Sequence, residues 1–279
     1  MLIFVGIGDA YGAGFEYAPL DLIRQRNDLS GYVQHPRHLG IKPGMYTDDT
    51  QMSLAVAEAL LHSHRPSRLD WAQHFVTAFQ RDRREGYAQR FYDFLQGVSD
   101  GADFLTRIKP HSDKSGAAMR ALPVGFLNTP ETVLEVAAEQ ARLTHDTPDG
   151  VRSAQAVALA AHHFLKGGSL LGLPASLQAL LGGGWFNWRG KVGPAGLDSA
   201  RAALTALVEH RSMAALLKAC VNYSGDVDTV AALALGLAGC CPEYERNLPE
   251  VLLRDLEDGP YGKGYLQELD LKLRKRFPC

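Results

Sequence analysis

Apolar residues return at helical spacing along most of this chain. Between residues 51 and 62 they fall on one face of a 3.6-residue repeat, which is typical of an amphipathic helix. Residues suited to helix starts, such as Ser67 and Thr129 followed by Pro130, precede two further stretches of this kind. The pattern predicts helices over residues 51–62, 67–81, 86–97, 129–143, 151–165, 198–210, 212–222, 228–240, 247–256 and 265–276.

The pattern predicts almost no β-structure. Residues 2–5 could form one short strand, but helical spacing continues through Gly12, so a helix is favoured there. The longest stretch without a helical pattern is 167–196, which is rich in Gly and Pro and is expected to be a loop. No repeat or linker interrupts the chain. The sequence therefore predicts an all-α fold, with one compact multi-helix domain over residues 1–279.

Composition narrows the classes of protein that remain. A net charge of −2 gives no global attraction to nucleic acid or to an anionic membrane, and no run of about 20 apolar residues could span a bilayer. The start of the chain lacks the charged region of a signal peptide. The four cysteines match no zinc spacing and are expected to be reduced. We expect a cytoplasmic monomer without a membrane or nucleic-acid partner.

Two acidic motifs carry the candidate chemistry. The first acidic motif is Thr47-Asp48-Asp49-Thr50, the second is Gly225-Asp226-Val227-Asp228-Thr229, and each stands just before a helical stretch. Carboxylate and hydroxyl oxygens without Cys or His are the ligands that Mg²⁺, Mn²⁺ and Ca²⁺ prefer. If folding joins the motifs, four carboxylates share one volume and two divalent cations would cancel their charge. Ordinary helix capping is the alternative for each motif alone.

A third segment, residues 6–16, is rich in glycine and ends at Glu16. It is not a dinucleotide fingerprint, because Tyr11 stands where the third glycine belongs and no strand–helix alternation follows. A helix of small residues packed closely on its neighbours is the better interpretation. Glu16 is then either a general acid or base beside a divalent site, or an exposed charge at a helix end.

Taken together, these motifs resemble the ADP-ribosylglycohydrolase family. The resemblance rests on Gly-Asp-Ala-x-Gly-Ala-x-x-Glu at 8–16, Thr-Asp-Asp-Thr at 47–50 and Gly-Asp-x-Asp-Thr at 225–229, in this order. Residues 116–120 (Gly-Ala-Ala-Met-Arg) and 143–145 (Leu-Thr-His) agree with it. The family includes dinitrogenase-reductase-activating glycohydrolases and the ADP-ribosylarginine and ADP-ribosylserine hydrolases.

The resemblance implies an all-α fold with a binuclear Mg²⁺ or Mn²⁺ centre in a cleft. It implies that Asp228 bridges the ions and that Glu16 stands beside the scissile bond, with Asp48 and Asp49 also catalytic. The metal ligands that it implies are Thr47, Asp48, Asp49, Asp226, Asp228 and Thr229. The substrate-binding residues expected are Ser112, Lys114, Ser115, Gly116, His145 and Tyr87.

Two segments depart from the family pattern. Lys114-Ser115-Gly116 replaces a Gly-Asn-Gly, and residues 86–90 lack two glycines of a Gly-Tyr-Gly-x-Gly motif. Lys114 or Arg90 could instead meet a diphosphate, or each could be a solvated side chain. Trp185, Phe186, Trp188 or Tyr87 could support an adenine, and core packing is the alternative for each of these four aromatic residues.

The reaction that the resemblance implies is hydrolysis of the bond between ADP-ribose and an acceptor, which is an ADP-ribosylated protein or another ADP-ribose conjugate. Such a bond breaks at C1″ of the ribose through an oxocarbenium-like transition state. An arginine acceptor is favoured as a family expectation. Serine, polymer, nucleic-acid and metabolite linkages stay open, as does a non-catalytic protein that only binds ADP-ribose.

Overall fold

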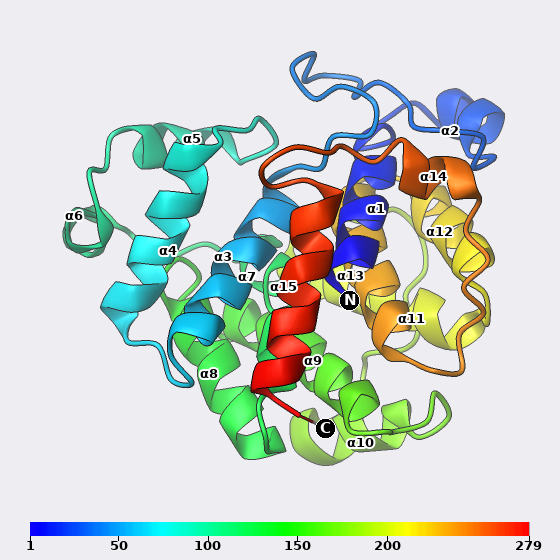
Figure 1. Cartoon of the computed structure of the whole chain (residues 1–279). Helices are drawn as coiled ribbons and strands as arrows, with labels where there is room; N and C mark the ends of the chain where they lie inside the picture. The colour runs from blue at the N-terminus through cyan, green and yellow to red at the C-terminus, as the bar shows by residue number, and fades with distance from the viewer. Residues whose placement is uncertain (279) are drawn as a thin grey trace.

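The computed structural model describes residues 1–278 and is built from helices throughout (Figure 1). Within this range no β-strand forms, and only four isolated β-bridges join loop segments. The all-α prediction is confirmed. The elements are α1 (Leu2–Ala13), α2 (Leu20–Arg26), α3 (Asp48–His62), α4 (Arg68–Arg81), α5 (Gln89–Gln96), α6 (Gly101–Arg107), α7 (Gly116–Met119), the short 3₁₀ helix η1 (Leu122–Phe126), α8 (Pro130–Arg142), α9 (Pro148–Leu165), α10 (Leu173–Leu181), α11 (Gly196–Glu209), α12 (Met213–Asn222), α13 (Val227–Cys240), α14 (Glu250–Arg254) and α15 (Lys263–Arg276).

The centre of the fold is the pair α1 and α13, which lie side by side in Figure 1. Every residue of α13 is buried, and after Asp228 and Thr229 in its first turn the helix is apolar on all sides, as a helix in the centre of a fold must be. The two helices approach so closely because glycines of α1 face α13. A methyl group added at Gly8 would lie 2.3 Å from the Ala231 carbonyl oxygen, and one at Gly12 would lie 2.5 Å from Cα of Asp228. Small residues thus set the distance between the two helices.

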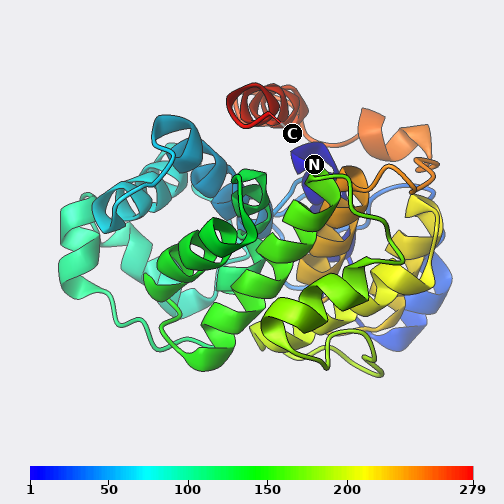
Figure 2. The same ribbon diagram turned by 90° about the horizontal axis from the view of Figure 1, so that it is seen from below.

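The other helices form layers around this pair. Helices α11 and α12 pack on α13, while α9 packs on α8, η1 and α11 in the lower part of the molecule (Figure 2). Helix α15 crosses α1 and α3, where the N-terminal ammonium group contacts Asp270 Oδ2 at 2.6 Å. The last helix of the chain therefore packs beside the start of the first.

Two predicted helix starts are confirmed, since Ser67 forms a capping box and Thr129 caps α8 ahead of Pro130. Residues 2–5 belong to helix α1 and not to a strand. The expected loop at 167–196 is wrong in part, because α10 lies inside it. Its flanking glycines and Pro174 suggested a loop, although proline is tolerated in the first turn of a helix. The helices α2, α6, α7 and η1 were not predicted, because each is too short to show a period.

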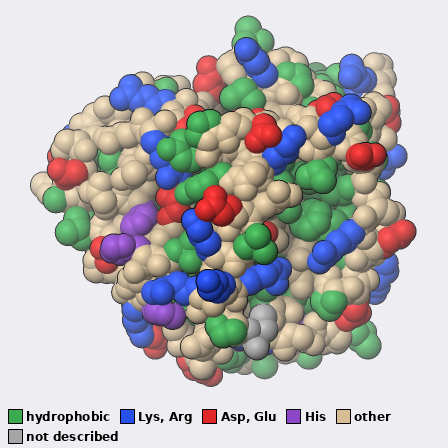
Figure 3. Space-filling model, in the orientation of Figure 1, with side chains coloured by type: hydrophobic (Ala, Val, Ile, Leu, Met, Phe, Trp, Pro, Cys, Tyr) green, Lys and Arg blue, Asp and Glu red, His purple; other side chains and the backbone are tan. Residues whose placement is uncertain are grey.

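The surface carries charges of both signs. On the face shown in Figure 3, basic and acidic side chains are interspersed, as the net charge of −2 suggests. None of the helices in residues 1–278 has the length and apolar character needed to cross a bilayer. Cys220, Cys240 and Cys241 are buried free thiols, and Cys279 lies outside the described residues.

Candidate active site

The first acidic motif is held by Asp9, a fully buried residue of α1. The amides of Thr47 and Thr50 donate hydrogen bonds to the Asp9 carboxylate at 2.9–3.0 Å. The hydroxyls of the same two residues donate at 2.9 and 2.6 Å. Thr47 also caps α3 by accepting from the Asp49 amide. Asp9 therefore fixes the start of α3 against α1 and determines where the motif's own carboxylates lie.

The second acidic motif begins with a turn that requires glycine. Gly225 has φ +92°, and a Cβ there would lie 1.9 Å from the Val192 carbonyl oxygen. The Asp226 amide donates to that same oxygen at 3.2 Å, and the Val192 amide donates to Ser224. The amide of Tyr17, just after α1, donates to the Gly225 carbonyl at 2.8 Å. The end of α1 is thus bonded directly to the turn that presents Asp226.

This packing brings Glu16 to the second motif. Oxygen atoms of Glu16, Asp226 and Asp228 lie within 4.8 Å of one another. The contact depends on Gly12, whose missing side chain lets the backbone of Asp228 approach α1. Asp226 and Asp228 are each only 7% exposed, and Glu16 is half-buried. Three carboxylates from two distant parts of the chain therefore share one small volume.

The two acidic motifs meet as well. The Thr229 side chain lies beside the Asp49 carboxylate and acts to lower its pKa. The charge of Asp226 raises the pKa of both Asp48 and Asp49. Asp48 and Asp49 therefore lie near the second motif, although the carboxylates found within 4.8 Å of one another are those of Glu16, Asp226 and Asp228.

Burial and mutual repulsion favour the protonated forms of these carboxylates unless a cation binds beside them. Burial is the largest cause that raises the pKa of all four aspartates in the two motifs, and neighbouring carboxylates raise it further. The main neighbouring charge is Asp9 for the first motif and Glu16 for the second. The pKa of Asp226 is raised to about 6, although contacts with Asp228, Ser199 and Ser115 partly oppose the rise.

The donor set fits a hard divalent cation. Among the residues described, Asp49 Oδ1 and Asp228 Oδ1 are buried without any hydrogen-bond partner. Asp226 occupies the position before α13, yet its side chain makes no capping bond. Helix capping therefore explains a polar side chain at position 47, but it does not explain the one at position 226. Unpartnered buried carboxylate oxygens are costly, and an oxygen-binding cation such as Mg²⁺ or Mn²⁺ would satisfy them.

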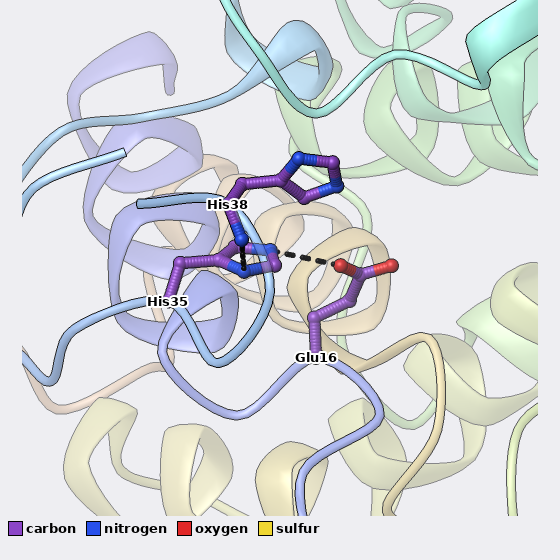
Figure 4. A group of neighbouring side chains, drawn as sticks. All are labelled: Glu16, His35 and His38. Carbon is purple, nitrogen blue, oxygen red and sulfur yellow. Dashed lines mark hydrogen bonds and ion pairs between the residues drawn. The ribbon is translucent and has the colours of Figure 1, made fainter. Parts of the chain in front are cut away.

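Glu16 is held by two residues of the loop between α2 and α3, His35, which is drawn in Figure 4, and Arg37. His35 Nε2 lies 2.9 Å from Glu16 Oε2, and Arg37 Nη2 lies 3.0 Å from Oε1. Burial acts to raise the pKa of Glu16, but the His35 hydrogen bond and the Arg37 charge outweigh it and the pKa is lowered. Glu16 is thus ionised at neutral pH, and the exposed helix-end alternative does not describe it.

The loop at residues 112–116 lies beside the second motif. The Ser115 side chain lies beside the Asp226 carboxylate and acts to lower its pKa. Gly116 packs on the His145 ring, where an added methyl group would lie 2.8 Å from Cε1. Ser112 accepts a hydrogen bond from the Lys114 amide at 3.2 Å, which shapes the loop. The Lys114 side chain is exposed, so within this segment it is Ser115 that reaches the acidic site.

His145 is a neutral histidine at the edge of this loop. It is buried, and burial together with the charge of Arg120 lowers its pKa to about 3. Its Nδ1 shares a 2.6 Å hydrogen bond with the Thr144 hydroxyl. A neutral imidazole can donate or accept a hydrogen bond but adds no positive charge to the site.

Three residues that the sequence suggested as substrate contacts are packed in the core or exposed to solvent. Tyr87 lies near Asp48, but its ring packs in the core against Phe79 and its hydroxyl donates to Gln51 at 2.6 Å. Arg90 is exposed on α5. Trp185 is 2% exposed and its indole N–H donates to a backbone carbonyl, as core packing predicts.

Residue patterns did not reveal two supporting groups. Asp9 belongs to the 8–16 segment, but its spacing from Thr47 gives no sign that it binds the first motif. His35 stands in a loop without a motif, next to Pro36. Only the fold brings either residue to the site.

Comparison with known proteins agrees with this geometry. A family model described as ADP-ribosylglycohydrolase matches residues 1–278. The chain is 26% identical to the ADP-ribosyl-(dinitrogen reductase) glycohydrolase of Rhodospirillum rubrum, over 98% of this chain and 90% of that protein. It is 22% identical to the ADP-ribosylarginine hydrolase Tri1 of Serratia proteamaculans, over 91% and 74%.

A solved structure has the same fold. The protein described as an ADP-ribosylglycohydrolase-related protein complex superposes with a TM-score of 0.76 at 24% identity, over 98% of this chain and 95% of that one. At this identity the likeness supports the fold alone, while the sequence match over nearly all residues decides the family. The chain belongs to the ADP-ribosylglycohydrolase family.

Proposed function

We propose that this protein is an ADP-ribosyl glycohydrolase, which cleaves the bond between ADP-ribose and a modified acceptor and releases ADP-ribose. Family membership supports this class of activity, since similar proteins are named as such glycohydrolases and hydrolases. The observation that carries the proposal is the meeting of the two acidic motifs, with Asp49 Oδ1 and Asp228 Oδ1 buried and unpartnered.

Two divalent cations, Mg²⁺ or Mn²⁺, are the cofactors that we assign to this site. The proposed ligands are the side chains of Thr47, Asp48, Asp49, Asp226, Asp228 and Thr229. When bound, such cations supply positive charge that holds substrate hydroxyls and orients the ribose. The packing of α1 supports this assignment, because Asp9 binds the first motif while Gly12 of the same helix closely approaches Asp228 of the second.

Glu16 is the proposed catalytic carboxylate. Its lowered pKa keeps it ionised, which suits it to accept a proton from water or to stabilise positive charge on an oxocarbenium-like transition state. A carboxylate held in this state is a poor general acid. Ser199 donates a hydrogen bond to Asp226, Ser115 lies beside the same carboxylate, and His145 packs on the loop that carries Ser115.

An arginine acceptor is the favoured linkage. The support comes from a relative named as an ADP-ribosylarginine hydrolase, which aligns with 91% of this chain. We therefore propose ADP-ribosylated protein as the substrate, with ADP-ribosylarginine as the first linkage to test.

A panel of conjugates with defined linkages tests the function. Peptides that carry ADP-ribosylarginine or ADP-ribosylserine, ADP-ribose polymer and ADP-ribosylated DNA are incubated with the protein and Mg²⁺ or Mn²⁺. Mass spectrometry then measures released ADP-ribose. Release from arginine peptides supports the full proposal, whereas release only from another conjugate corrects the acceptor. If no conjugate is cleaved while calorimetry detects ADP-ribose binding, the protein is a binder and the hydrolase proposal is wrong.

A further inference from the structure

His35 has hydrogen-bond partners that determine its protonation state. Its side chain is 1% exposed. The backbone amides of Arg37 and His38 both donate to Nδ1 at 3.0 Å. An atom that accepts from two N–H groups carries no hydrogen of its own, so the proton of the neutral ring is on Nε2. The Nε2–H group therefore donates to Glu16 Oε2 at 2.9 Å.

This hydrogen bonding argues against a metal ion at the same residues. Glu16, His35 and His38 offer ligand atoms within 4.8 Å of one another, and Figure 4 shows the three side chains grouped together. A histidine ligand, however, must present a bare ring nitrogen to the ion. The bare nitrogen of His35 points at two backbone amides, and its other nitrogen carries a proton toward Glu16. The group is therefore a hydrogen-bonded support.

Glu16 needs such a support. Its carboxylate lies within 4.8 Å of Asp226 and Asp228, and like charges at this distance repel. The Glu16 side chain is 15% exposed, so contacts with neighbouring protein groups must offset this repulsion. Arg37 helps, but its side chain is 54% exposed and its charge is screened by water. His35, which is buried, provides the more directional contact.

We propose that His35 is a positioning residue, which holds the Glu16 carboxylate beside the second acidic motif through its Nε2–H group. The inference rests on the proposed function, in which Glu16 acts on the ADP-ribosyl bond. The inference gives a role at the candidate active site to a residue whose loop carries no recognisable motif. The same ring anchors that loop through Nδ1, so the two nitrogens have separate tasks.

Two substitutions separate these tasks. In His35→Asn the side-chain oxygen can replace Nδ1 as the loop acceptor, but the donor to Glu16 is lost. In His35→Gln the longer amide can replace the Nε2–H donor, but the loop acceptor is lost. We expect His35→Asn to lower kcat about 10- to 100-fold with KM nearly unchanged, as for other residues that orient a reacting group. His35→Gln should restore most of kcat. The opposite order would overturn the inference.

Controls and a second readout make the result specific. His38→Phe keeps a ring beside His35 but removes a candidate ligand, so we expect kcat to be unchanged, and a large loss would favour a metal site. In a Glu16→Gln background, His35→Asn should have no further effect. Additive losses in that background would contradict positioning.

Nitrogen NMR of labelled histidine tests the inference without turnover, with the His35 signals assigned by their absence in His35→Asn. A bare Nδ1 and a protonated Nε2 support it, and a protonated Nδ1 overturns it. If the tautomer is as expected but the wild type cleaves no conjugate, the proposed function fails and the contact stands. If the wild type is active and His35→Asn is equally active, only the positioning inference fails.

Discussion

Removal of one carboxylate from the acidic site should stabilise the metal-free protein. The substitution is Asp226→Asn, which keeps the shape of the side chain and can still accept the hydrogen bond from Ser199. Asp226 is 7% exposed and lies close to the charges of Glu16 and Asp228. Folding must therefore transfer its negative charge into a buried site that is already negative.

The magnitude follows from the pKa. Folding raises the pKa of Asp226 from 3.8 to about 6. At about 1.4 kcal/mol for each factor of ten, ionised Asp226 costs the folded state about 3 kcal/mol. Because the folded pKa is above the unfolded one, this cost is absent below the unfolded pKa and is complete above the folded pKa. Asp226→Asn removes it, so the gain is at most about 3 kcal/mol, or about 6–12 °C in Tm.

The assay is thermal unfolding after removal of metal with EDTA, at about pH 7.5 and at about pH 4. We expect Asp226→Asn to melt above the wild type at the higher pH, with the difference nearly lost at the lower pH. Addition of Mn²⁺ should raise the Tm of the wild type more than that of the variant. Asp21→Asn is the matched control, since that carboxylate is 83% exposed and its loss should change stability by less than about 0.5 kcal/mol.

The outcome that refutes the reasoning is an Asp226→Asn protein that, without metal, is no more stable than the wild type at the higher pH. The burial of a charged carboxylate beside other carboxylates would then not destabilise the metal-free protein, and the argument for cations would lose its electrostatic basis.

Other predictions concern the metal ligands and the helix contact. Asp228→Ala should abolish turnover and weaken ADP-ribose binding measured by calorimetry; unchanged activity in saturating Mg²⁺ would count against a bridging role. Prolonged EDTA treatment should remove activity, and Mn²⁺ or Mg²⁺ should restore it, whereas full activity in excess chelator would contradict metal dependence. Gly12→Ala should destabilise the protein by about 1–3 kcal/mol in urea unfolding, because its methyl group would overlap Asp228. Gly264→Ala meets no atom within 4 Å and should be neutral or slightly stabilising, so equal effects would refute the packing argument.

Long helices were predictable because their signals are local. Ser67 and Thr129 act as caps through bonds within three residues, and the apolar repeats they precede extend over several turns. Helix α10 was missed because glycines on both sides and Pro174 give its short sequence the composition of a loop. The packing of its leucines on α9 is a long-range contact that no local pattern contains.

The same distinction applies within the site. The residues of the two acidic motifs were recognisable by type and order, and the structure brings them to one place. The burial of Tyr87 in an aromatic cluster and the contact of His35 with Glu16 were not recognisable. Each depends on a partner from another segment, and a sequence does not state which partner a side chain meets.

The sequence by itself determined the helical character of the chain, the oxygen-rich chemistry of its motifs and its family. These properties depend on residue type and on spacing over a few residues, and both can be recognised without knowledge of the tertiary structure. Only the tertiary structure decided that Asp9 anchors the first motif, that Gly12 admits Asp228 and that His35 holds Glu16. The physical reason is range: a hydrogen bond or a carboxylate repulsion acts over a few ångströms, and only packing of distant helices brings these groups that close.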